Sequence, residues 1–192
     1  MNLPAPAPLF PEDLIDFTSQ IDDADDRARK LLDGLSESQA NWQPGAGAQW
    51  SIVQCIEHMA LTNRSYLQAL QASVSRARPG HTRLQPAGWF SRYFLRKTEP
   101  PVSIKIKAPK KIAPAPAIPA RTALQNFLDS NDTVRRFARE TAALDLCGTR
   151  FKNPYVPGLN FTIATGLLII AAHNRRHLWQ AERVRQSSDF PA

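Results

Sequence analysis

The sequence predicts an all-α protein folded as a four-helix bundle, with a long proline-rich connector between the second and third helices. Three observations indicate this fold class. Apolar residues recur at helical spacing over long stretches, turn-forming residues separate these stretches, and no block is rich in strand signals. An apolar fraction of 43% over 192 residues is sufficient for the core of one domain. We expect this domain at residues 12–186, between a flexible arm at residues 1–11 and a tail at residues 187–192.

The first two long helices have recognisable limits. The first is expected from Glu12 to about Leu35, with the aspartates of residues 22–26 mostly on its solvent-exposed side. The second is expected to begin at Ser51, a residue type that caps helix N-termini, and to end at about Ala77. Glycine or proline near the end of each pattern indicates where the helix stops.

The segment after the second helix is rich in proline. A short helical piece is expected at about residues 88–97, and prolines then recur throughout residues 98–119. Because proline lacks an amide hydrogen and restricts the residue before it, these positions exclude a continuous helix or a central strand. We therefore expect residues 98–119 to form an extended connector outside the four-helix core.

The third and fourth helices complete the predicted bundle. The third is expected from Arg121 to about Leu144, and the fourth from about Phe161 to Gln186. Residues 147–160 are expected to connect them. Long helices joined by connectors of unequal length are typical of a four-helix bundle.

Charge is distributed unevenly along the chain, whose net charge is +7. Residues 1–40 contain nine acidic and three basic residues, whereas residues 76–111 contain ten basic residues and one acidic residue. The basic segment predicts either a patch for nucleic acid or anionic lipid, or a solvated connector that complements the acidic first helix. We favour the connector because the segment lacks a nucleic-acid-binding motif, so nucleic acid is not an expected partner.

The sequence favours a cytoplasmic protein. Its first residues have neither a basic start nor an apolar segment, so they do not resemble a signal peptide. The longest apolar run, residues 161–172, is too short to cross a bilayer and continues directly into polar residues, so no membrane partner is expected. Two cysteines, Cys55 and Cys147, are more consistent with reduced thiols than with a disulfide framework.

The histidines form the most informative pattern. His173 and His177 are four residues apart in the predicted fourth helix, a spacing that places both side chains on one face. The second helix carries His58 on a stripe that mixes polar and apolar residues. Because bundles build metal sites from side chains on facing helices, we predict that His58, His173 and His177 bind one divalent metal ion. His81 is expected in a surface loop.

Two stretches resemble the DinB-like (YfiT-type) superfamily: "LSESQANWQPGAGAQWSIVQCIEHMALTN" and "NPYVPGLNFTIATGLLIIAAHNRRHLWQAERV". Proteins of that superfamily are four-helix bundles in which one metal-binding histidine follows a Trp-Ser helix start and two others form an H-x3-H motif near the C-terminus. The matching positions here are His58, His173 and His177, with Gln180 after them, and the order of parts covers residues 12–186. The superfamily includes thiol S-transferases, a mycothiol-dependent isomerase and proteins described as metal-dependent hydrolases. The resemblance therefore implies the site more firmly than the reaction.

Three neutral imidazoles would hold Zn²⁺ or Ni²⁺ and leave a coordination position open. A metal ion held in this way lowers the pKa of a bound water or thiol, which predicts a hydrolase or a thiol S-transferase. The expected partner is a small-molecule substrate, with a low-molecular-weight thiol among the candidates. The alternative is a non-catalytic metal-binding bundle with a stress-response or interaction role, and the sequence leaves a homodimer open.

Several neighbours of the histidines allow two interpretations. Gln180 either hydrogen-bonds an imidazole or a metal-bound water, or makes a bond between helices without a chemical role. Cys55 is favoured as a small buried hydrophobic residue over a reactive thiol near the metal. Glu57 is expected at the surface, and Arg175 and Arg176 are expected in solvent or at an interface. A metalloprotease of the H-E-x-x-H type is excluded, because its glutamate is absent after the first histidine of the pair.

Overall fold

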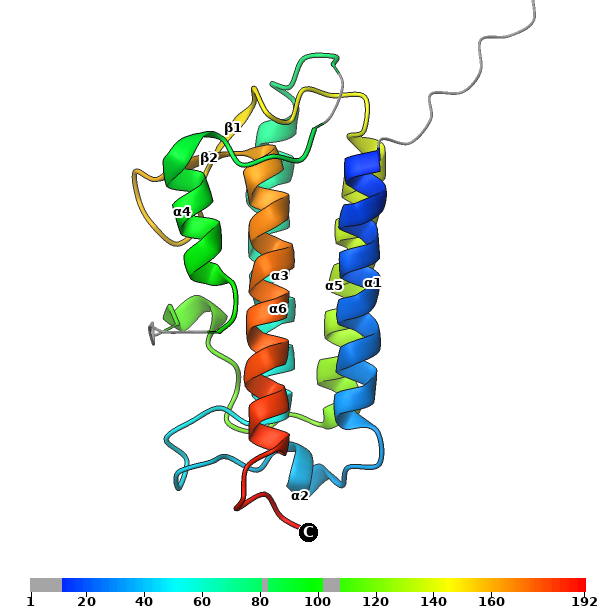
Figure 1. Ribbon diagram of the computed structural model, residues 1–192, viewed down its shortest axis with the longest axis vertical. Coiled ribbons are helices and arrows are strands. Elements are labelled where there is room, and N and C mark those ends of the chain that lie inside the picture. The colour runs from blue at the N-terminus through cyan, green and yellow to red at the C-terminus, as the bar shows by residue number, and fades with distance from the viewer. Residues whose placement is uncertain (1–11, 81–82, 102–107) are drawn as a thin grey trace, which may run out of the picture.

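The computed structural model describes residues 12–80, 83–101 and 108–192 and is mostly helical, which confirms the all-α prediction (Figure 1). Only one two-stranded sheet interrupts the helices in this described part of the chain. The predicted arm at residues 1–11 and His81 lie outside the described residues. The elements in chain order are α1 (Glu12–Leu32), α2 (Glu37–Ala40), α3 (Ile52–Val74), α4 (Gly88–Thr98), the 3-10 helix η1 (Lys110–Ile112), α5 (Ala120–Glu140), β1 (Arg150–Lys152), β2 (Asn160–Thr162) and α6 (Ile163–Arg185).

Four long helices carry the core. Helix α3 packs against α5 and α6, and α1 packs against the same two helices (Figure 1). One apolar cluster lies near the sheet and includes Phe17, Leu70 and Phe151. A second lies towards α2 and includes Ile56 and Phe127. All four long helices contribute buried residues to both clusters, and the metal-ligand candidates lie on two of them, α3 and α6.

The starts of the long helices agree with the prediction better than their ends. Ser51 caps α3 as predicted, since its hydroxyl accepts a hydrogen bond from the amide of Gln54 and the Gln54 side chain bonds the Ser51 amide. In contrast, α1, α3 and α5 each end a few residues earlier than expected. At the end of α5, the amide and the hydroxyl of Thr141 both donate to the carbonyl of Phe137.

The small sheet replaces part of a predicted connector and the first residues of the predicted fourth helix. Strands β1 and β2 are antiparallel, and Phe151 pairs with Phe161. Both phenylalanines are buried, so tertiary packing holds a ribbon whose strands are only three residues long. Helix α6 then begins at Ile163 rather than at Phe161, with Thr162 as its cap.

The proline-rich segment returns to the core along the N-terminal end of α3. Residues 102–107 of the predicted connector lie outside the described residues. Beyond them Ile112, in η1, is buried. The Gln54 side chain donates to the carbonyls of Ala115 and Pro116, at 3.1 and 3.3 Å. This return segment therefore lies against the helix that carries His58.

The C-terminal tail contacts the end of the molecule at which α2 lies. The ring of Phe190 packs edge-on against Trp42, with ring centroids 5.6 Å apart. The Gln39 side chain donates to the carbonyl of Pro191 at 3.3 Å. Among the described residues, no helix combines the length and apolar character needed to cross a membrane.

Candidate metal centre

The three predicted histidines come together. His58 on α3 and His173 and His177 on α6 each offer a ligand nitrogen, and these nitrogens lie within 4.8 Å of one another. The ring centroids are 4.4 to 5.0 Å apart. Two nitrogens bound to one Zn²⁺ ion at about 2.0–2.1 Å are at most about 4.2 Å apart, so a small rotation of the rings would bring the three nitrogens to one ion.

The site faces the connector side of α3 and α6. Asn174 follows His173 on α6 and meets Asn131 of α5, so His173 itself is turned about 100° away from α5. On α3, the ring of His58 meets the backbone of Ile112 in η1. The histidines therefore lie where α3 and α6 meet, on the side that the returning connector contacts through Ile112.

Two of the imidazole rings are oriented by hydrogen bonds at Nδ1. His58 donates its Nδ1 hydrogen to the carbonyl of Ile112 at 2.7 Å, and His177 donates its Nδ1 hydrogen to Oε1 of Gln180 at 3.0 Å. With Nδ1 protonated, Nε2 of each ring carries the free lone pair that a metal requires. Ile112 was not among the predicted site residues, because a backbone carbonyl leaves no signal in a sequence.

His173 is oriented differently. Its Nδ1 is buried and has no hydrogen-bond partner among the described residues. A buried polar nitrogen without a partner is costly, and such groups are rare in folded proteins. Three converging imidazoles with an unpartnered nitrogen among them fit a borderline transition metal such as Zn²⁺ or Ni²⁺.

Burial keeps all three imidazoles neutral. It lowers the pKa of His58, against the opposing effect of the hydrogen bond to Ile112, and Arg176 lowers it further. Burial also holds the pKa values of His173 and His177 well below 6.5, helped by the neighbouring histidines and by Arg176. The neutral ring is the form that binds a metal, so no proton has to be displaced at neutral pH.

Trp50 and Arg176 border the site. The Trp50 ring lies 4.6 Å from that of His58 and 5.8 Å from that of His177, measured between centroids. Arg176 is half-buried, and its guanidinium donates to the carbonyl of Lys97 at 3.2 Å. Its charge acts on all three histidines. The sequence placed Arg176 in solvent or at an interface, because helix position does not reveal where a long side chain ends.

The other neighbours have structural roles. Cys55 is fully buried, and burial raises the pKa of its thiol far above the ordinary value, as expected of an inert hydrophobic residue. Glu57 was expected at the surface but is buried, because its carboxylate accepts a hydrogen bond from Asn126 of α5 at 2.9 Å. Arg175 is partly buried within the chain, where it pairs with Glu99 at the end of α4.

Three hydroxyl groups converge beside the site. Thr62 and Ser65 lie one and two turns after His58 on the same face of α3. Both are buried, and their hydroxyls lie close enough to that of Tyr155 to oppose the rise that burial causes in its pKa. None of the three is aligned for a hydrogen bond within the described structure. Buried hydroxyls without an aligned partner are rare, because an unmade hydrogen bond is costly.

Comparison with known proteins identifies the family. No curated protein and no solved structure gives a significant match to the chain. The family model of the DinB superfamily matches residues 20–181, a range that contains all three histidines and the four long helices except the ends of α1 and α6. The chain therefore belongs to the DinB superfamily.

Proposed function

We propose that this protein is a metal-dependent enzyme that activates a small nucleophile at His58, His173 and His177. The observation that carries the proposal is the convergence of three neutral imidazoles within 4.8 Å. Hydrogen bonds to Ile112 and Gln180 orient two of these rings. The four long helices and the returning connector support a four-helix bundle as the scaffold of this site.

The side chains around the site would bind the ion and orient its ligands. Three neutral ligands leave the charge of a divalent ion uncompensated, and that charge lowers the pKa of a water or thiol beside it. Arg176 adds a second positive charge close to the histidines, which favours anionic ligands. The Trp50 ring covers two of the imidazoles and limits the access of water from its side.

A thiol suits this site better than water. The potential ligand cluster of the described residues contains no carboxylate, and Glu57, adjacent to His58, is bonded to Asn126 instead. A hydrolase of this kind needs a base to take a proton from water during attack, whereas a thiol can bind already deprotonated. We therefore favour a thiol S-transferase, in which the hydroxyls of Thr62, Ser65 and Tyr155 orient the substrate, over a hydrolase.

The test measures metal binding and turnover separately. Protein without a histidine tag is loaded with Zn²⁺ or Ni²⁺, its metal content is measured, and thiols paired with electrophiles are screened beside esters and amides. We expect one ion per chain and activity with thiols. His173→Ala should abolish both, whereas His81→Ala, which removes the only histidine outside the cluster, should change neither.

Two results would contradict the proposal. Metal binding without turnover of any thiol, ester or amide would indicate a non-catalytic site. If His173→Ala lost the ion but kept its activity, the reaction would not depend on the three histidines.

A further inference from the structure

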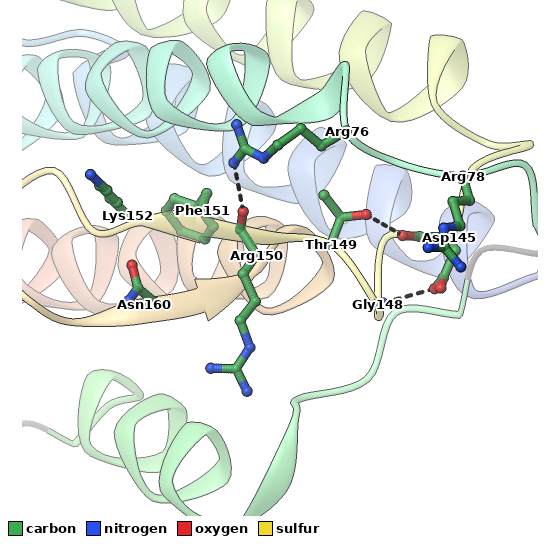
Figure 2. A pocket seen from close by; sticks show the side chains of 9 residues that line it. All are labelled: Arg76, Arg78, Asp145, Gly148, Thr149, Arg150, Phe151, Lys152 and Asn160. Carbon is green, nitrogen blue, oxygen red and sulfur yellow. Dashed lines mark hydrogen bonds between the residues drawn. The ribbon is translucent and has the colours of Figure 1, made fainter.

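A second region, remote from the histidines, has the chemistry of an anion-binding site. A hollow of about 720 Å³ lies beside β1 and the end of α3 (Figure 2). Four of its lining residues are cations and one is acidic. We call the four cations the basic groove: Arg76, Arg78, Arg150 and Lys152.

The fold assembles the basic groove from two distant segments. Arg76 and Arg78 follow the last turn of α3, whereas Arg150 and Lys152 are the two exposed residues of β1. Phe151, between them, is buried in the core, so the alternation of the strand forces its neighbours outward. Arg76 donates to the carbonyl of Arg150 at 3.1 Å and joins the two segments.

The charges of the basic groove are not neutralised locally. Within the described residues, none of its four cations forms an ion pair, whereas Arg27, Arg135 and Arg175 are all paired with carboxylates. The acidic residue of the hollow, Asp145, accepts a hydrogen bond from the amide of Gly148 at 2.8 Å.

The cations are spread out rather than focused on one point. Figure 2 shows the side chain of Arg76 reaching β1 from one side and that of Arg150 leaving β1 on the other, with Lys152 and Arg78 towards the two ends of the hollow. A second hollow of about 300 Å³ shares Arg76 and Lys152 and extends along α3 as far as Ala69. Such an elongated array matches a row of phosphates better than a single phosphate.

Exposed aromatic rings lie on the neighbouring helix. Helix α4 packs on β2 through Phe90, which stacks on Phe161 with ring planes 12° apart. The same helix carries Trp89, 74% exposed, and Tyr93, 44% exposed, which have no core function. Basic grooves accompanied by exposed aromatic rings are the usual means of binding single-stranded nucleic acid, because the phosphates pair with cations and the bases stack.

We propose that the basic groove binds single-stranded nucleic acid through its phosphate backbone, with Trp89 as a stacking residue for a base. A lipid membrane is a poorer match, since a flat bilayer surface cannot follow cations into a hollow. The sequence alone favoured a solvated connector for residues 76–111. The structure adds the two cations of β1 and the hollow that they share.

Binding of a fluorescein-labelled oligothymidylate of about 12 nucleotides, followed by anisotropy, tests the proposal. Four phosphate contacts predict a slope of about −3 for the logarithm of the association constant against that of salt concentration, between about 50 and 200 mM salt. Arg150→Ala and Lys152→Ala should each weaken binding and reduce the slope by about 0.7. Trp89→Ala should weaken binding by about fivefold or more and leave the slope unchanged.

The matched control is Arg121→Ala. It removes the same charge from an exposed residue in the first turn of α5, at the end of the molecule opposite the sheet (Figure 1). We expect it to leave affinity and slope unchanged. His177→Ala should also have no effect, which separates this proposal from the metal-dependent activity. Circular dichroism checks that every variant is folded.

Four results would overturn the proposal. They are absence of binding at low salt, equal weakening by Arg121→Ala, and an unchanged affinity in Trp89→Ala. The fourth is binding of anionic lipid vesicles or of inorganic pyrophosphate that is stronger than oligonucleotide binding and is lost in Arg150→Ala.

Discussion

The three-histidine site and the basic groove are both built from nitrogen bases, but they differ in burial. His58 and His177 are only 3% and 7% exposed, whereas Arg150 and Lys152 project into solvent. Both regions lie along α3, and the 16 residues from His58 to the end of the helix place them about 24 Å apart.

Burial decides what the bases in each region can bind. In the histidine site, loss of hydration lowers the pKa values, so the rings are neutral and present lone pairs to a cation. In the basic groove, guanidinium and ammonium groups remain hydrated and charged, so they attract anions. One helix thus connects a site suited to a metal ion with a site suited to phosphates.

Loss of one imidazole should produce the largest difference between the regions. We expect His177→Ala to weaken Zn²⁺ binding about a hundredfold or more, because four-ligand structural zinc sites have binding free energies of about 10–16 kcal/mol, or about 3 kcal/mol per ligand. Oligonucleotide binding should not change. The measurement is competition with a chromophoric chelator, and the melting temperature of the metal-free variant should stay close to that of the parent. If the variant were unfolded, and if the parent protein also unfolded when a chelator removed the ion, the ion would have a structural role instead.

Between about pH 5.5 and 7.5, the pH dependence of stability should arise mainly from the histidine site rather than from the basic groove. Since the folded-state pKa values of its histidines lie below 6.5, the unfolded chain takes up more protons at acidic pH. The free energy of unfolding of the metal-free protein should have its full value above about pH 6.5. Below that pH it should fall by up to about 1.4 kcal/mol per histidine for each pH unit.

Urea unfolding at several pH values tests this expectation. His173→Leu, which cannot take up a proton, should have a shallower pH dependence than the parent, whereas His81→Ala should match the parent if only the clustered histidines are responsible. A profile that is flat between about pH 7.5 and 5.5 would contradict the lowered pKa values.

A change in the packing beneath the basic groove should affect stability, while the histidine site keeps its chemistry. Gly166 on α6 packs so closely that an added Cβ would lie 2.7 Å from Leu70 Cδ2 and 2.7 Å from Phe151 Cε1. Because both neighbours are buried, we expect Gly166→Ala to destabilise the fold by about 2 kcal/mol. Thermal unfolding measures the effect, and adding Phe151→Leu should recover part of it. If the losses of stability in the double variant were additive, the strain would not arise from the contact between the added methyl group and Phe151.

The smallest expected effect concerns the orientation of a ligand. Gln180→Ala removes the acceptor that holds the His177 ring, and such supporting groups contribute about tenfold to metal affinity. Gln125→Ala is a matched control, because that side chain bonds Asp129 on the exposed side of α5. Equal Zn²⁺ affinity in the two variants would mean that the Gln180 bond has no role at the site.

The sequence by itself determined the helical fold and the identity of the three histidines. Both depend on short-range periodicity: an apolar face needs residues three or four positions apart, and so does the pair His173 and His177. Helix ends were less predictable, because side-chain bonds such as that of Thr141 to the last turn compete with continuation of the helix.

Only the tertiary structure decided the features that join distant segments. A three-residue strand has no pattern of its own, so the ribbon around Phe151 depends on burial against α6. The carbonyl of Ile112 reaches His58 because the connector folds back, and no residue type encodes a backbone oxygen. The basic groove likewise needs the end of α3 beside β1. Charge counts along a chain cannot report this proximity, because electrostatic potential depends on distance in space rather than along the sequence.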